Sequence, residues 1–229
     1  MSSEDRSSRR VHVDAYDLSD VLAVEGVGSV DPGTNLLVSG GPMLGTERLA
    51  LELLAIDADE KAIAVTPDTA GSRLRDDFAS VAGEPDPLRV VDCTGASGSG
   101  SFDDTDDVKY VTSPGDLTGI GMGIVKCTRD MGESVDDGLR LGVLSLSTLL
   151  RYSDPDRVFN FLHTVTGRVS AADYLGIATL DPGAHDPQDV NTLSSQFDFV
   201  VELREADEDR LLDDTEFVGA LRDFEESDG

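Results

Sequence analysis

Short apolar runs alternate with amphipathic segments along most of this chain. The apolar runs that fit buried strands lie at residues 35–38, 62–66, 88–91, 109–112, 139–146, 174–180 and 199–203. The segments whose apolar residues recur at helical spacing lie at residues 46–55, 72–81, 117–131, 156–169 and 187–196. This alternation predicts a three-layer α/β fold, in which a mostly parallel sheet is covered by helices on both faces.

The two ends of the chain depart from this pattern. Residues 1–10 are polar, which predicts a disordered N-terminus, and residues 223–229 form an acidic tail. Residues 215–221 form one more apolar run, which we expect to pair with residues 199–203 as a C-terminal antiparallel edge hairpin. The length between the ends, residues 11–222, fits one domain with room for a complete core.

A glycine-rich turn between residues 35–38 and 46–55 has the frame of a phosphate-binding loop. That motif asks for Gly, four residues of any type, Gly, Lys, and then Ser or Thr. Its eight positions are held here, in order, by Gly40, Gly41, Pro42, Met43, Leu44, Gly45, Thr46 and Glu47. Thr46 thus replaces the lysine that attracts phosphate, and Glu47 replaces the hydroxyl that binds magnesium. Attraction is removed and repulsion is added.

Two interpretations of this turn remain open. Backbone N–H groups and the dipole of the following helix can hold an anion without lysine, though more weakly. Alternatively, the turn only joins strand to helix, because Glu47 in the first helical turn can itself satisfy the dipole. The two replacements favour the second interpretation.

Acidic residues outnumber basic ones by 46 to 18, for a formal net charge of -28. They are spread over helices and loops, which is typical of the solvated surface of proteins from salt-loaded cytoplasms. A surface that meets a basic partner is the alternative. In either case the charge repels nucleic acid, and no basic stripe is present, so we expect no direct nucleic-acid binding.

The sequence also bears on compartment and metal binding. No apolar run approaches the ~20 residues of a membrane span, and the first ten residues lack the apolar core of a signal peptide. Cys93 and Cys127 are isolated, without a CxxC motif or a nearby histidine pair, so they indicate neither zinc nor disulfides. We expect a cytoplasmic protein without membrane contact and without a bound metal.

Three further segments imitate functional motifs. Residues 94–107 are rich in Gly, Ser and Asp but fit neither a phosphate loop nor an EF-hand, which favours a surface loop whose tip could dock a partner. Glycines at alternate positions in residues 119–123 indicate close helix packing or a weakened helix. His185 follows a strand and, with Asp181 and Asp186, could sense a phosphate or hold a metal, although the same residues make ordinary turns.

Several ordered blocks together carry a family resemblance. They lie at residues 31–45, 143–152, 157–169 and 180–186, the last leading into residues 197–205. Over roughly residues 20 to 205 the chain resembles the KaiC/GvpD-type branch of the RecA superfamily, as found in haloarchaeal RecA-like proteins. The resemblance implies a RecA-like P-loop fold that binds ATP.

The resemblance also assigns positions at two other strand ends. The family's Walker B strand reads as an apolar run followed by Asp and Ser, and here Leu144 occupies the aspartate position before Ser145. A leucine cannot hold magnesium. The acidic residue that activates water in the family has only Asp68 as a counterpart. Both metal-handling positions are thus lost, so magnesium-dependent hydrolysis is not expected.

We therefore predict a RecA/KaiC-like domain with a degenerate nucleotide site. It would serve as a non-catalytic regulatory or protein-interaction module in signalling or transcription, through a protein partner or self-association. It would need no cofactor and would bind ATP weakly or not at all. The alternative is a divergent ATPase that uses a subunit-shared site or an unusual lysine, with Asp68 as base. A role in DNA recombination or repair is disfavoured by the charge.

Overall fold

A seven-stranded sheet forms the centre of the computed structural model, which describes residues 13–22, 28–55, 60–82, 88–95, 103–132 and 138–204. The strands are β3 (Asn35–Ser39), β4 (Lys61–Thr66), β5 (Leu88–Asp92), β6 (Val108–Tyr110), β7 (Leu139–Val143), β8 (Leu175–Leu180) and β9 (Phe199–Glu202). Their order is β6-β5-β4-β7-β8-β3-β9, and every neighbouring pair is parallel. The predicted parallel α/β sheet is confirmed.

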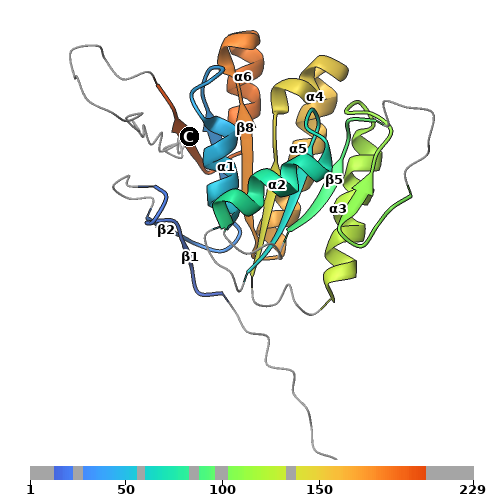
Figure 1. The fold of residues 1–229 in the computed structure, drawn as a ribbon. Helices are drawn as coiled ribbons and strands as arrows, with labels where there is room; N and C mark the ends of the chain where they lie inside the picture. Colours follow the sequence, from blue (N-terminus) through green and yellow to red (C-terminus); the bar gives the residue numbers. More distant parts are fainter. Residues whose placement is uncertain are drawn as a thin grey trace, which may run out of the picture.

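Helices cover both faces of this sheet (Figure 1). One face carries α1 (Thr46–Ala55) and α2 (Gly71–Ala82), and the other carries α3 (Leu117–Met131), α4 (Leu146–Tyr152), α5 (Pro155–Ala171) and α6 (Pro187–Ser194). Successive strand residues face opposite ways, so Leu36 and Val38 join the core under α1 while Leu37 joins the core under α5. The predicted three layers follow.

Local chemistry explains where several helices begin. Asp116 caps α3, because its Oδ1 accepts a hydrogen bond of 2.8 Å from the backbone N–H of Gly119. Pro155 and Pro187 stand at the first positions of α5 and α6, where the missing N–H is not needed. The helices predicted at residues 46–55 and 117–131 are confirmed at both ends.

One predicted strand is too long. The apolar run at residues 139–146 is a strand only as far as Val143, and a new helix, α4, starts at Leu146. Ser145 makes the change of direction with a left-handed φ of 60°. The error has a physical reason: a continuous apolar run does not distinguish a buried strand from the start of a buried helix.

A small antiparallel hairpin precedes the sheet and was not predicted. It consists of β1 (Tyr16–Asp17) and β2 (Ser29–Val30), which are too short to give a periodic signal. Tyr16 nevertheless joins the core under α1 and is fully buried. The expectations for residues 1–10, 215–221 and 223–229 lie outside the described residues. No helix in the described part of the chain combines the length and hydrophobicity that crossing a bilayer requires.

Candidate functional site

The carboxyl ends of β4, β7, β8 and β3 meet at one edge of the sheet, where these four strands lie side by side. The loops that follow such ends are the usual ligand-binding side of a parallel sheet. The glycine-rich turn follows β3, Asp68 follows β4, Leu144 and Ser145 follow β7, and Asp181 follows β8. Which of the predicted site residues come together therefore depends on the geometry of this edge.

The glycine-rich turn keeps the shape of a loop wrapped around a helix N-terminus. The Gly40 N–H donates to the Leu180 carbonyl at 3.1 Å, and a Cβ on Gly40 would lie 2.9 Å from Thr46 Cγ2, so this position requires glycine. Gly45 has a φ of 82° and Met43 a φ of 70°. Such values favour glycine, so the Met43 backbone is strained. The turn thus retains a demanding geometry.

Beside the end of this turn lies a hollow of about 120 Å³, here called the loop cavity. Its walls come from α1, the ends of β4, β7 and β8, and the start of α4, through Thr46, Glu47, Asp68, Leu144, Ser145, Ser147, Thr179, Leu180 and Asp181. Six residues singled out in the sequence are therefore brought together, namely Thr46, Glu47, Asp68, Leu144, Ser145 and Asp181. They come from four separate segments of the chain.

The charge of the loop cavity is one-sided. Three carboxylates line it, those of Glu47, Asp68 and Asp181, and no Lys, Arg or His is among its lining residues. Loss of surrounding water, and then the carboxylate of Asp68, raise the pKa of Glu47 above its usual value. An anion entering this hollow meets repulsion where a phosphate loop would supply a lysine.

The three lysines of the protein all lie elsewhere. Lys61 is at the amino end of β4, the opposite edge of the sheet. Lys109 pairs with Asp130 at 2.8 Å, and Lys126 pairs with Asp104 at 2.8 Å. None of them lines the loop cavity, so no lysine of the same chain replaces the missing one in this conformation.

Leu144, which the family resemblance assigns to the Walker B position, is a core residue. Its side chain is 2 % exposed and belongs to the core under α1, and its N–H donates to the Val65 carbonyl at 3.0 Å. An aspartate here would present oxygen atoms to a hydrated cation, and a leucine presents only methyl groups. The wall of the loop cavity is apolar where a magnesium site needs oxygen.

A chain of hydroxyl groups ties the strand ends together, and the sequence analysis missed it. Thr179 Oγ1 accepts from the Ser145 N–H at 2.7 Å, and the hydroxyls of Ser145 and Thr148 lie 2.8 Å apart. Thr148 Oγ1 donates to Asp68 Oδ2 at 2.8 Å. Asp68, the candidate base, is thereby held in place from α4. The only sequence signal was a hydroxyl three residues after Ser145, one helical turn away.

His185 does not line the loop cavity. It follows the 3-10 turn η2 (Pro182–Ala184). The two acidic residues proposed beside it act as caps, because Asp181 Oδ1 accepts from the Gly183 N–H at 2.9 Å and Asp186 Oδ1 accepts from the Gln188 N–H at 2.8 Å. Within the described ranges, no three His, Cys, Asp or Glu residues are arranged to hold a metal ion.

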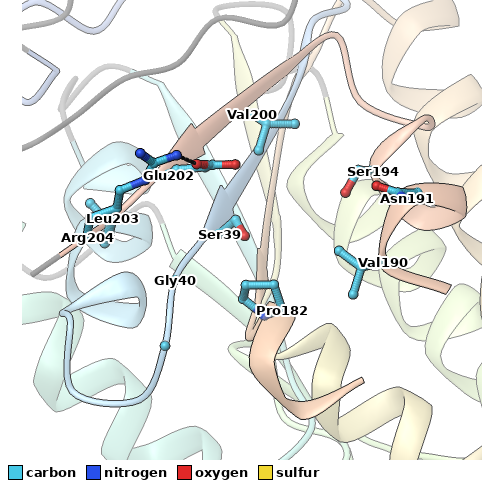
Figure 2. A pocket seen from close by; sticks show the side chains of 11 residues that line it. Ser39, Gly40, Pro182, Val190, Asn191, Ser194, Val200, Glu202, Leu203 and Arg204 are labelled. Atoms are coloured by element: carbon cyan, nitrogen blue, oxygen red, sulfur yellow. Dashed lines mark hydrogen bonds and ion pairs between the residues drawn. The ribbon is translucent and has the colours of Figure 1, made fainter. Parts of the chain in front are cut away.

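A larger hollow of about 520 Å³, here called the edge cavity, borders the start of the glycine-rich turn (Figure 2). Gly40 and Gly41 border it, together with the ends of β3 and β9 and one side of α6. Its polar wall includes Ser194 and Asn191, and its one cation, Arg204, pairs with Glu202. The sequence carried no motif for it, because its walls come from elements more than 140 residues apart.

A comparison with known protein families assigns the chain to one of them. A family model described as a family of unknown function, DUF7504, matches residues 33–203. That range covers most of the 229 residues, so the chain belongs to this family. No curated protein gives a significant match.

Solved structures share the fold. The uncharacterized protein PH0321 from Pyrococcus horikoshii, in complex with an unknown peptide, aligns with a TM-score of 0.62 and 13% identity over 80% of this chain and 83% of that chain. The KaiC-like protein PH0186 from Pyrococcus horikoshii OT3 aligns with a TM-score of 0.54 and 17% identity over 85% and 80%. At such identities the likeness shows the fold alone, which is KaiC-like and hence RecA-like, as the sequence resemblance implied.

Proposed function

We propose that this member of the DUF7504 family is a KaiC-like domain that does not hydrolyse nucleotide and acts as a regulatory or protein-interaction module, in signalling or transcription-related control. The observation that carries the proposal is the composition of the loop cavity, which brings together the positions where the family resemblance expects the lysine, the magnesium-binding hydroxyl and the Walker B aspartate. Thr46, Glu47 and Leu144 stand there together, with two further carboxylates and no cation.

Electrostatics argues against phosphate in this hollow. A triphosphate carries several negative charges, and the attraction of a lysine is normally what offsets their desolvation. Glu47 and Asp68 instead add repulsion at close range, where charges interact by about 1–4 kcal/mol at 4 Å in water or at a protein surface. The volume of about 120 Å³ is also below the roughly 300–1,000 Å³ of small-molecule sites.

Two features support action through protein contact. Met43, at the tip of the turn, is fully exposed, so an apolar side chain stands where a working loop would fold over phosphate. The fold neighbour PH0321 was solved with an unknown peptide, which is a precedent for a peptide-binding member of this fold. A protein partner or a second copy is the expected ligand, and the net charge of -28 argues against nucleic acid.

Calorimetry of ATP and ADP binding, in molar potassium chloride with magnesium, tests the proposal on the folded full chain. We expect no detectable heat of binding and no release of phosphate. ATP binding at micromolar affinity would contradict a degenerate site, and ATP turnover would support the divergent ATPase instead.

A restored variant tests whether the turn keeps its shape. Thr46→Lys, Glu47→Thr and Leu144→Asp together return the charge, the hydroxyl and the metal-binding carboxylate to the loop cavity. ATP affinity should then rise above that of the wild type. Because Leu144 is buried, the double variant Thr46→Lys with Glu47→Thr serves as a control that leaves the core intact. Unchanged affinity in both, with native circular dichroism, would mean that the turn does not form a phosphate cradle.

The divergent ATPase remains the second candidate, and the edge cavity is the observation that favours it. Its volume of about 520 Å³ suits a nucleotide, and it borders Gly40 and Gly41. A cation from a neighbouring subunit would then complete the site, with Asp68 as base. Saturable ATP binding that is lost in Gly41→Trp would support this candidate, whereas the proposal predicts no binding in either protein.

A further inference from the structure

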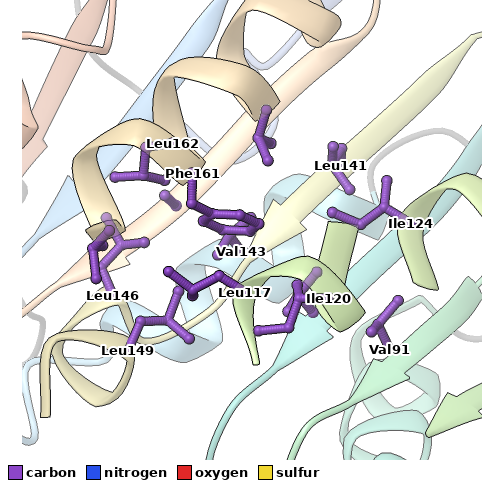
Figure 3. Packing of buried hydrophobic residues seen from close by; sticks show 14 of the residues in the cluster. Val91, Leu117, Ile120, Ile124, Leu141, Val143, Leu146, Leu149, Phe161 and Leu162 are labelled. Carbon is purple, nitrogen blue, oxygen red and sulfur yellow. The ribbon is translucent and has the colours of Figure 1, made fainter. Parts of the chain in front are cut away.

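A groove runs between α3 and α5, on the face of the sheet opposite α1. Two hollows of about 420 and 440 Å³ form it, and they share Thr118, Gly121, Thr164 and Val165, so they are continuous. Figure 3 shows the buried cluster that α3 and α5 form with the sheet. This feature is called the α3–α5 groove below.

The α3–α5 groove is apolar and open. Its floor reaches Leu141 of β7, and Met122 and Val125 on its α3 side are 58% and 42% exposed. These are two of the four large hydrophobic side chains that the described residues leave exposed. A Cβ built on Gly121 would meet nothing within 4 Å, so the groove stays wide at its middle. A contiguous exposed apolar surface of this kind marks an interaction site.

The rim of this groove is basic, unlike the rest of the chain. Lys126, Arg157 and Arg168 line the two hollows, and no acidic side chain does, in a protein with a net charge of -28. Arg157 and Arg168 form no ion pair with any other described residue, whereas Lys126 is 49% exposed and pairs with Asp104. Two of the three cations are thus available to an acidic ligand.

The spacing of the cations sets the geometry of a ligand. Arg157 and Arg168 stand eleven positions apart on α5, or about 16 Å at a rise of 1.5 Å per residue. A helix lying along the groove would place acidic residues eleven positions apart opposite them. Between these, apolar side chains at i, i+3 or i+4 and i+7 would enter the groove, as in helix-in-groove recognition.

We propose that the α3–α5 groove binds an acidic amphipathic helix of a partner protein. The proposal rests on the proposed function, since a module that works by contact needs a docking surface. A second copy is a poorer occupant, because a two-fold interface would set the arginines of one groove against those of the other. The same cations reject basic helices, which supplies specificity.

Fluorescence anisotropy with a synthetic helical probe tests the proposal on the full chain. The probe carries Leu at i, i+4 and i+7 and Glu at positions eleven apart, and a matched probe carries Lys in place of Glu. We expect the acidic probe to bind at least about tenfold more tightly than the basic one, with the difference shrinking as salt rises. Equal binding of both probes, or of neither, would overturn the proposal.

Two variants of the protein locate the probe. Arg157→Glu with Arg168→Glu reverses two exposed charges and should lower affinity for the acidic probe at least about tenfold. Gly121→Leu adds a side chain to the groove at a position where a Cβ meets nothing within 4 Å, and it should abolish binding. Gly167→Leu is the matched control, because this α5 glycine is also unobstructed but lines neither hollow, and it should bind like the wild type.

Sedimentation and the ATP experiment separate the remaining outcomes. A change of oligomeric state in Gly121→Leu would show that the groove binds a second copy of the chain, and it would contradict the proposed binding of a partner helix. Absence of both ATP binding and probe binding would overturn the groove and leave the non-catalytic function standing. ATP turnover together with probe binding would overturn that function and leave the groove.

Discussion

The two ends of α1 meet opposite electrostatic surroundings. At its C-terminal end, the Leu53 carbonyl accepts a hydrogen bond of 2.9 Å from Arg140 Nη1, and Arg140 also pairs with Glu60. The Arg140 and Glu60 side chains are 1% and 8% exposed. A cation near a helix C-terminus complements the helix dipole. Tyr16 closes the cluster, with its ring 5.2 Å from the guanidinium carbon.

At the N-terminal end of α1, by contrast, like charges gather. Glu47 lines the loop cavity with Asp68 and Asp181, and no Lys, Arg or His is among the lining residues. The helix dipole favours an anion here, whereas desolvation and the neighbouring carboxylate of Asp68 raise the pKa of Glu47.

The difference shows that the polar groups of the two sheet edges have different roles. At the amino edge, every charge of the cluster has a partner, so its polar interactions stabilise the fold. At the carboxyl edge three carboxylates lie together, and hydrogen bonds from the Thr148 hydroxyl to Asp68 and from the Gly183 N–H to Asp181 offset their repulsion. Substitutions at the two edges should therefore change the free energy of unfolding by different amounts, and even in opposite directions.

The largest effect is expected from Arg140→Met. It leaves Glu60 charged and buried, so the free energy of unfolding should fall by about 3–5 kcal/mol. Denaturation in urea with potassium chloride measures the change. Arg129→Met is the control, because Arg129 is 75% exposed and its loss should cost less than about 1 kcal/mol. Adding Glu60→Gln to Arg140→Met should recover part of the loss.

Tyr16→Phe should have the next largest effect. The Tyr16 hydroxyl shares its single proton between the Leu139 and Asp173 carbonyls, at 3.3 and 3.0 Å, and accepts from the Leu139 N–H at 3.2 Å, so its removal should cost about 1–3 kcal/mol at neutral pH. The exposed Tyr152 provides the control, since Tyr152→Phe should leave stability unchanged. If Tyr16→Phe lost as little stability as Tyr152→Phe, the buried hydroxyl of Tyr16 would not stabilise the amino edge.

The same variant carries a prediction for alkaline pH. Burial raises the pKa of Tyr16 to about 12. The unfolded chain loses this proton near pH 10 while the folded chain keeps it, so wild-type stability should fall between pH 10 and 12. The contribution of one such group approaches about 1.4 kcal/mol per pH unit. Urea denaturation at pH 8 and pH 11 should show a smaller fall in Tyr16→Phe than in the wild type.

Thr148→Val tests the hydroxyl chain at the carboxyl edge. It removes the hydrogen bond to Asp68 and the contact with Ser145, so we expect a loss of about 0.5–1.5 kcal/mol by urea denaturation. Thr192→Val is the control, because Thr192 bonds the Gln188 carbonyl on an exposed helix surface. Equal small losses of stability in the two variants would mean that the hydroxyl chain does not stabilise the fold.

The smallest effect, with the opposite sign, is expected from Glu47→Gln. Because the pKa of Glu47 is raised in the folded state, its contribution is present at low pH and is lost as pH rises through that pKa. The variant should thus be slightly more stable than the wild type at pH 7, by less than about 0.5 kcal/mol or roughly 1–2 °C in Tm. The gain should vanish below pH ~4. Glu52→Gln, which breaks a pair with Arg48, should show no gain.

Much of the site was predictable because it follows from strand order. Carboxyl ends of neighbouring parallel strands meet, and this explains why Glu47, Asp68 and Leu144, each assigned from the sequence near the end of a strand, share the loop cavity. Thr148 was missed because α4 was not predicted, and only its first residue, Leu146, had been assigned, to the strand at residues 139–146.

The amino-edge cluster was not predictable in the same way. Arg140 stands inside an apolar run, and its partner Glu60 is 80 residues away, so the sequence around neither residue indicates that the two form an ion pair. The edge cavity and the α3–α5 groove were missed for the same reason, since each is a space between elements rather than a pattern within one.

The sequence by itself determined the order and type of the main elements, and the loss of the lysine, hydroxyl and aspartate expected of a nucleotide site. Hydrophobic periodicity and turn chemistry act between residues close in the chain, so a linear reading captures them. Tertiary structure alone decided which charges are compensated. The energy of a charge depends on the solvent and partners around it, and packing brings Arg140 to Glu60 but leaves Glu47 beside Asp68.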